Sequence, residues 1–104
     1  MRKTYPLQPE GKHPDRVLEA VKHDIRKYVK RQRRVALPQG VDFWDFDCRV
    51  GLSADTAAPV HFGNLIEQID VAAQAGATAV YVELLVKNGQ RQARPQVAGE
   101  EGQD

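Results

Sequence analysis

The stretch "DFWDFDCRVG", residues 42–51, alternates two kinds of side chain, and this alternation sets the fold. Successive side chains of a β-strand point to opposite faces of the sheet. One face of this strand would carry the apolar residues Trp44, Phe46, Cys48 and Val50. The other face would carry Phe43, Asp45, Asp47 and Arg49. The stretch therefore predicts a half-buried strand whose face with Trp44 lies on the core.

An amphipathic helix is predicted before this strand, over residues 15–37. Its apolar residues recur at steps of three and four, which is the spacing of one helical face: Val17, Leu18, Val21, Ile25, Tyr28 and Val29. Pro14 suits the first turn of a helix, and "PQG" at 38–40 ends it. A second helix is predicted over residues 61–76, with Gly76 at its C-terminal cap.

Two further strands are predicted, over residues 2–7 and 77–87, so that the order of elements is β-α-β-α-β. The expected fold is α/β of the α+β kind, a two-layer sandwich with a three-stranded sheet and both helices on one face. A right-handed crossover would make the first two strands parallel. The segment 52–60 is interpreted as a loop, and it is long enough to leave the direction of the third strand open.

One domain is expected over residues 1–87, because 104 residues are enough for a single core. From Asn88 onward Val97 is the only large apolar residue, so 88–104 is predicted to be a disordered tail. No apolar run approaches the ~20 residues of a membrane helix. Cys48 is the only cysteine, and without a possible intramolecular disulfide a cytoplasmic protein is expected.

The net charge of +1 hides a division between the two ends of the chain. Residues 1–34 carry eleven Lys and Arg against four Asp and Glu, a net charge of +7, and the rest carries four against ten, or −6. Seven cations lie between residues 22 and 34: Lys22, Arg26, Lys27, Lys30, Arg31, Arg33 and Arg34. Such a band can bind the phosphates of RNA, DNA or another polyanion. It can also be a solvated face with cations at the negative end of the helix dipole.

Three carboxylates, Asp45, Asp47 and Glu83, form a second candidate site on the uncovered face of the sheet. If the second and third strands are neighbours, these groups lie within about 10 Å of one another. Oxygen ligands of this kind could hold Mg²⁺ or Mn²⁺ in a metal-dependent enzyme. The alternative is a solvated sheet face on which Arg49 acts as the counter-ion. The apolar residues Phe43, Tyr81 and Leu85 on that face favour a protein contact, such as a homodimer.

Other chemical motifs are absent from the sequence. The three histidines are dispersed and Cys48 stands alone, so no zinc site is predicted. Neither a phosphate-binding loop, nor a dinucleotide fingerprint, nor a nucleophile elbow around Ser53 is present. No cofactor and no catalytic residue are therefore predicted, and an enzyme is the less favoured class.

The stretches "RKTYPL", "HPDRVLEAVKHDIRKYVKRQRR" and "LPQGVDFWDFDCRVG" together resemble a family of small bacterial proteins of unknown function. The resemblance covers most of residues 2–87, and "DFWDFDC" is its most distinctive part. It implies a bacterial cytosolic protein and no particular activity. The leading hypothesis is a non-enzymatic binding module with a basic helix, and the protein contact and the metal-dependent enzyme are its alternatives.

Overall fold

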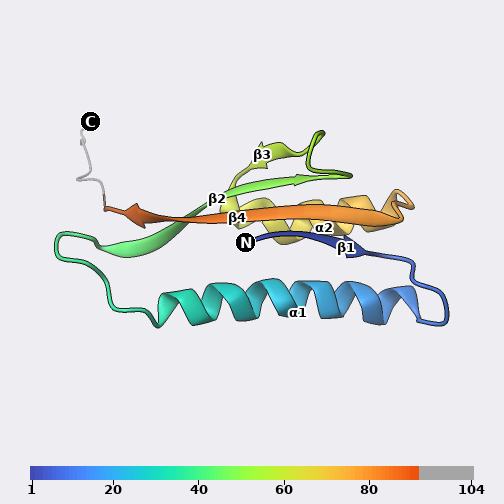
Figure 1. The fold of residues 1–104 in the computed structure, drawn as a ribbon, viewed down its shortest axis with the longest axis horizontal. Helices are drawn as coiled ribbons and strands as arrows, with labels where there is room; N and C mark the ends of the chain where they lie inside the picture. The colour runs from blue at the N-terminus through green and yellow to red at the C-terminus, as the bar shows by residue number, and fades with distance from the viewer. Residues whose placement is uncertain (92–104) are drawn as a thin grey trace, which may run out of the picture.

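Two helices and a four-stranded sheet form the two layers of the fold in the computed structural model, which describes residues 1–91 (Figure 1). The elements follow in this order: β1 (Arg2–Pro6), α1 (Pro14–Arg33), β2 (Phe43–Gly51), β3 (Ala58–Val60), the 3₁₀ turn η1 (Phe62–Asn64), α2 (Leu65–Gln74) and β4 (Ala79–Gly89). The predicted α+β class is confirmed, and the sheet differs in detail from the prediction.

The strands lie in the order β1-β4-β2-β3, and every neighbouring pair is antiparallel. Since β4 lies between β1 and β2 and opposes both, these two strands run in the same direction, as the crossover rule predicts. The prediction of three strands was wrong because β3 lies in the segment interpreted as a loop. Only three residues of β3 pair with β2, and Pro59 is one of them, which a sequence pattern does not distinguish from a turn.

Strand β4 continues to Gly89, beyond the domain end expected at Lys87. Asn88 and Gly89 pair with Trp44 and Phe43, and backbone pairing needs no large side chain. Beyond the strand, the Arg91 backbone N–H donates to Asp42 Oδ2 at 2.7 Å. The remainder of the predicted tail, 92–104, lies outside the described residues.

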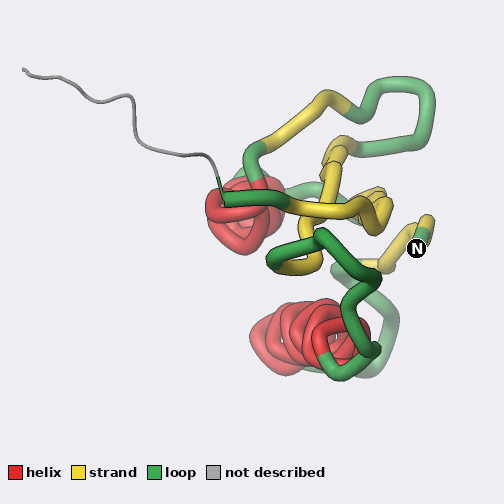
Figure 2. Tube along the Cα trace, turned by 90° about the vertical axis from the view of Figure 1, so that its left-hand side faces the viewer, coloured by secondary structure: helices red, strands yellow, loops and turns green. Residues whose placement is uncertain are grey.

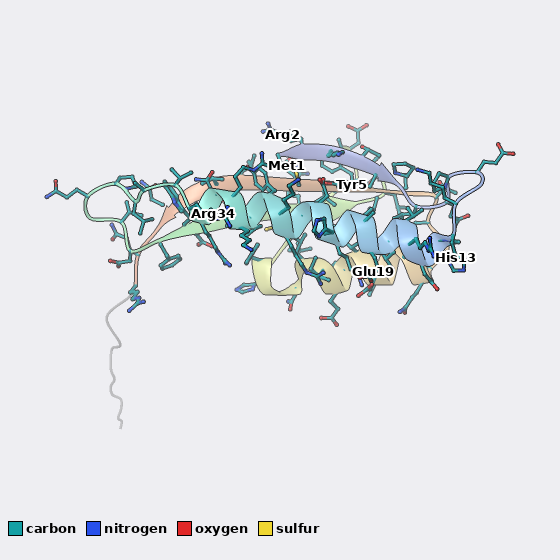
Figure 3. The ribbon with its side chains drawn as sticks, turned by 90° about the horizontal axis from the view of Figure 1, so that it is seen from below. Met1, Arg2, Tyr5, His13, Glu19 and Arg34 are labelled. Atoms are coloured by element: carbon teal, nitrogen blue, oxygen red, sulfur yellow. The ribbon has the colours of Figure 1, made fainter. Side chains whose placement is uncertain are left out.

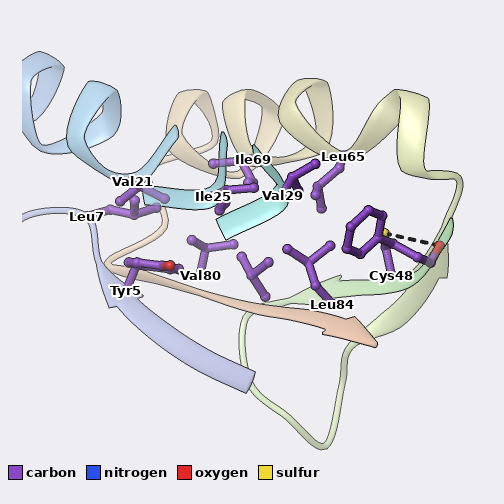
Figure 4. Close-up of a cluster of buried hydrophobic side chains, with 12 residues drawn as sticks. Tyr5, Leu7, Val21, Ile25, Val29, Cys48, Leu65, Ile69, Val80 and Leu84 are labelled. Carbon is purple, nitrogen blue, oxygen red and sulfur yellow. Dashed lines mark hydrogen bonds between the residues drawn. The ribbon is translucent and has the colours of Figure 1, made fainter. Parts of the chain in front are cut away.

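Both helices cover the same face of the sheet, and the core lies between the two layers (Figures 2 and 4). The core consists of Tyr5, Leu7, Val21, Ile25, Val29, Phe46, Cys48, Leu65, Ile69, Val80, Val82 and Leu84. Even-numbered residues of β2 and β4 supply its sheet side, as the alternation in "DFWDFDC" predicts. Within the described residues, neither helix has the length and apolarity required to cross a membrane.

Trp44 was predicted to lie in the core, but it is half-buried and lies outside the core cluster. It pairs with Asn88 where β2 and β4 extend beyond α2 (Figure 1). Its indole Nε1 donates to the carbonyl of Val35 at 2.9 Å. Trp44 therefore ties the start of β2 to the segment that follows α1.

Helix α1 ends at Arg33, four residues before the predicted end. Pro38 disfavours helical geometry at Leu37, and the chain turns from Arg34 on. The helix begins at Pro14, where the side chain of His13 caps it by accepting the Asp15 N–H at 3.2 Å.

Candidate functional site

A row of cations follows the side of α1 that faces away from the core. Val21, Ile25 and Val29 are the buried residues of this helix, and they face the sheet. With about 100° between successive residues, the opposite side is centred near Lys27 and Arg34. Six residues line one shallow depression along that side: His23, Arg26, Lys27, Lys30, Arg31 and Arg34. We call the five Lys and Arg residues of this set the basic stripe.

The basic stripe has no carboxylate partner within the part of the chain that the structure describes. No carboxylate oxygen there lies within 4.0 Å of a charged nitrogen of these five residues. The neighbours three and four residues away on this side of the helix are also cations, which repel each other. From Arg26 to Arg34 the stripe spans about 12 Å at 1.5 Å per residue. The five charges therefore form no ion pair within residues 1–91.

Lys22 and Arg33, which were predicted to belong to the same band, lie on the flank of α1 that faces α2 and η1. Lys22 Nζ lies 2.6 Å from Asp70 Oδ1 of α2 and 3.6 Å from Glu19 Oε2. The hydrogen bond to Asp70 raises the pKa of Lys22. The guanidinium of Arg33 lies 5.6 Å from the centre of the Phe62 ring. The structure therefore groups five of the seven predicted residues on one side of α1. The other two contact neighbouring elements: Lys22 contacts α2, and Arg33 contacts η1.

Asp45 and Asp47 lie on the sheet face opposite the helices, where Lys87 stands between them. Lys87 Nζ is 2.6 Å from Asp47 Oδ1 and 3.9 Å from Asp45 Oδ2. The hydrogen bond to Asp47 is the main cause that raises the pKa of Lys87. Asp45 also accepts the backbone N–H of Phe46 through Oδ1 at 2.8 Å. Both aspartates are therefore occupied by contacts within the sheet.

Glu83 was predicted to be exposed on this face, but only 6% of it is exposed. Its Oε1 accepts the Tyr81 hydroxyl at 2.8 Å and lies 3.4 Å from Arg2 Nε and 3.9 Å from Arg49 Nη1. The Tyr81 hydrogen bond, and then the two guanidinium groups, hold the pKa of Glu83 below its usual range. A buried carboxylate is tolerated here because it has both a donor and cations.

Tyr81 is buried for a different reason, although it too was expected to be exposed. Its partner in β2 is Gly51, which has no side chain, so the following loop can approach closely. A Cβ atom added to Gly51 would lie 2.6 Å from the Cα of Ala57. Arg49 Nη2 fixes this loop by donating to the Ala57 carbonyl at 2.7 Å. The sheet face is therefore partly covered by its own loop, which the strand pattern does not reveal.

The aromatic residue beside the two aspartates, Phe43, packs on the neighbouring strand. It is 40% exposed, and its ring lies over Gly89, its partner in β4. An added Cβ on Gly89 would meet the Phe43 ring at 2.2 Å, so the ring takes the place of the missing side chain. Phe43 therefore contributes to strand pairing, and only part of it is available to a partner.

The described residues contain no group of three His, Cys, Asp or Glu that could hold a metal ion. Asp45 and Asp47 share Lys87, whereas Glu83 lies among Tyr81, Arg2 and Arg49. The three carboxylates predicted as a candidate metal site are thus divided between two sets of partners.

Two of the histidines and the cysteine have structural positions. His13 and His61 cap α1 and η1, and His61 Nδ1 accepts the Gly63 N–H at 3.1 Å. Cys48 is buried, and this burial raises the pKa of its thiol to about 11. A thiol of this kind is largely protonated at neutral pH and is a poor nucleophile.

Residues 1–95 match the model of a family described as a family of unknown function (DUF6172). The chain belongs to the DUF6172 family. The match covers every helix and strand of the structure and extends beyond the resemblance over residues 2–87. Among the curated proteins and the solved structures compared with this DUF6172 protein, none matches it. Membership of DUF6172 assigns a family and no activity.

Proposed function

We propose that this protein is a non-enzymatic binding module that holds nucleic acid or another polyanion on the basic stripe. The supporting observation is the row of five cations on the solvent side of α1, without a carboxylate partner among the described residues. Seven cations in thirteen residues were difficult to explain as helix-end stabilisers. The structure gives a fold-stabilising contact to two of them, Lys22 and Arg33.

The chemistry of the stripe suits phosphates better than bases. Three of its members are arginines, whose guanidinium groups can bind phosphate oxygens through two hydrogen bonds. The stripe lies on the outer surface of one helix, and neither a second DNA-reading helix nor a zinc finger accompanies it in the described residues. Contacts to phosphate fix position without reading sequence, so we expect binding that depends strongly on salt and weakly on sequence.

The sheet face has less support as a binding surface. Its carboxylates Asp45 and Asp47 would repel phosphates. Of its expected apolar residues, Tyr81 is buried, Leu85 is half-buried and Phe43 covers Gly89, which leaves little apolar area for a homodimer. The alternative of a metal-dependent enzyme has less support because the three candidate carboxylates have cationic partners within the sheet.

Fluorescence anisotropy with labelled duplex DNA and single-stranded RNA tests the proposal, from about 50 to 200 mM salt. If all five cations contact phosphates of a duplex, the slope of log K against log salt approaches about −4.5, at roughly −0.9 per contact. Replacing Lys30 and Arg34 with glutamine should change the slope to about −2.7 by the same rule.

Lys12→Gln with Arg91→Gln is the matched control, because it removes two exposed cations outside the stripe. We expect this control to keep the slope of the unmodified protein. The proposal fails if neither nucleic acid binds at low salt. It also fails if the control variant and the stripe variant lose affinity equally, since binding would then follow net charge alone.

A further inference from the structure

Strand β1 is an edge of the sheet, and its outer side carries free backbone groups. The Leu84 N–H donates to the Met1 carbonyl, and the Leu7 N–H donates to the Thr78 carbonyl. Hydrogen-bonded pairs alternate along an antiparallel ladder, so the odd-numbered residues of β1 face β4. The N–H and C=O groups of Arg2 and Thr4 therefore point outward, away from the sheet.

A cleft of about 820 Å³ lies next to this edge, between β1 and the N-terminal half of α1. Figure 3 shows β1 beside the helix, with Tyr5 above it and His13 where the connecting loop enters α1. Val17 and Ala20 contribute apolar surface, and the loop closes one end with Gly11, Lys12 and His13. The cleft is within the range of volumes that hold small ligands or short peptide segments.

The surroundings of the cleft are mainly cationic. Lys3, Lys12 and Arg16 line it, and Asp24 is its one acidic lining residue. Asp24 already accepts the Tyr5 hydroxyl at 2.5 Å and lies 3.5 Å from Lys3 Nζ. Among the described residues, no carboxylate lies within 4.0 Å of the charged groups of Lys12 or Arg16. A ligand with carboxylates complements this charge.

One outward N–H at the free edge of β2 is covered by a side chain, whereas the outward N–H of Thr4 in β1 is not. Beyond β3, the Phe46 N–H points away from β4 and is taken by the Asp45 side chain at 2.8 Å. Side chains that cover edge donors in this way oppose pairing with another chain. Within residues 1–91, no side chain accepts a hydrogen bond from the Thr4 N–H, so this donor remains open to a strand.

We propose that an extended peptide segment rich in Asp and Glu adds to β1 as a fifth strand. Its backbone would pair with Arg2 and Thr4, and its alternate side chains would enter the cleft near Lys12 and Arg16. This mode combines backbone hydrogen bonds for affinity with side-chain sites for specificity. It is independent of polyanion binding on the basic stripe, which uses other residues of α1.

A labelled eight-residue peptide of alternating Glu and Val is the probe, and fluorescence anisotropy measures its affinity. Thr4→Pro removes the outward donor, and proline is tolerated where an edge N–H faces solvent. We expect Thr4→Pro to weaken binding by about tenfold, the effect of one or two backbone hydrogen bonds. Thr4→Val keeps the donor and the β-branched shape, so it should bind like the unmodified protein.

Amide hydrogen exchange of the unmodified protein gives a second measurement that does not depend on a variant. Saturating peptide should slow exchange at Arg2 and Thr4 by about tenfold or more, with no comparable change in β2. Protection at Val86 and Asn88 would place the peptide on the free edge of β4 and would refute the assignment to β1.

The basic stripe supplies the final control. Lys30→Gln with Arg34→Gln should leave peptide affinity unchanged within twofold, although it weakens polyanion binding. If this variant loses the peptide and Thr4→Pro keeps it, the peptide is bound only as another polyanion on α1, and the strand-addition proposal is wrong.

Discussion

The pair Lys22–Asp70 gives the sharpest prediction about the role of the cations of α1. We expect Lys22→Met and Asp70→Asn each to destabilise the protein, because each breaks the contact that joins α1 to α2. Lys22→Met keeps the apolar stem of the side chain, so the lost interaction is mainly the charged hydrogen bond. Neither change should alter polyanion affinity by more than about twofold, since the basic stripe is untouched.

The magnitude follows from the burial of the two side chains. The Lys22 side chain is 12% exposed and that of Asp70 is 34% exposed, with 2.6 Å between Nζ and Oδ1. Fully exposed ion pairs contribute about 0.2–1 kcal/mol, and hydrogen bonds to charged groups about 1.5–3 kcal/mol. The intermediate exposure of this pair therefore predicts a coupling free energy of about 1–1.5 kcal/mol. This corresponds to about 5–10 °C in the melting temperature of a domain of this size.

A double-mutant cycle in urea measures this coupling from the unfolding free energies of four proteins. Both single variants should show lower stability, and the second change should then cost much less than it does alone. A coupling below about 0.3 kcal/mol, together with weaker DNA binding by Lys22→Met, would refute the reasoning. Lys22 would then belong to the binding surface and not to the contact between the helices.

Three further predictions concern the sheet. Glu83→Gln should lower the melting temperature at pH 7, because the folded protein holds the pKa of Glu83 below its ordinary 4.5. The stability that the charged carboxylate gives is present above pH 4.5 and should be lost as the pH falls further. A variant as stable as the unmodified protein at pH 7 would contradict this prediction. Gly51→Ala should destabilise the protein by about 1–3 kcal/mol in urea unfolding, since its Cβ would overlap the Ala57 backbone, and an unchanged midpoint would show that the loop moves freely. Native Cys48 should react with iodoacetamide at pH 8 about 100-fold more slowly than in urea, because it is buried with a raised pKa, and equal rates would refute its place in the core.

The sequence was sufficient to predict that two helices form, although not their ends, and which residues share a face of each strand, because periodicity is a local property. The steps of three and four in α1 identify Val21, Ile25 and Val29, which are its buried residues. The alternation in β2 separates Phe46 and Cys48 from Asp45 and Asp47, and the register against β4 agrees with it.

Features that depend on distant segments could not be predicted. Glu83 is buried because β4 lies between β1 and β2, which brings Arg2 and Arg49 to it from both sides. Lys22 does not belong to the exposed row of cations, because it forms an ion pair with Asp70 of α2. Trp44 lies on the sheet face that the alternation predicts. It is only half-buried because the helices do not extend over it, and the sequence pattern does not show how far they extend.

For the basic stripe too, local features could be predicted from the sequence and contacts with distant segments could not. The concentration of cations in residues 22–34 was visible in the sequence, but the separation of stripe members from Lys22 and Arg33 needed the position of α2 and η1. The cleft beside β1 gave no local signal, because its lining comes from β1, the following loop and α1.

The most direct test of polyanion binding is a titration of ¹⁵N-labelled protein with a short DNA duplex, followed by the chemical shifts of its amides. The proposal predicts that the largest shifts occur between His23 and Arg34 and that they decrease as salt is raised from about 50 to 200 mM. Asp45, Asp47 and Lys87, on the opposite layer, should show little change. Shifts confined to the sheet face, or none at low salt, would contradict the assignment of the basic stripe as a polyanion interface.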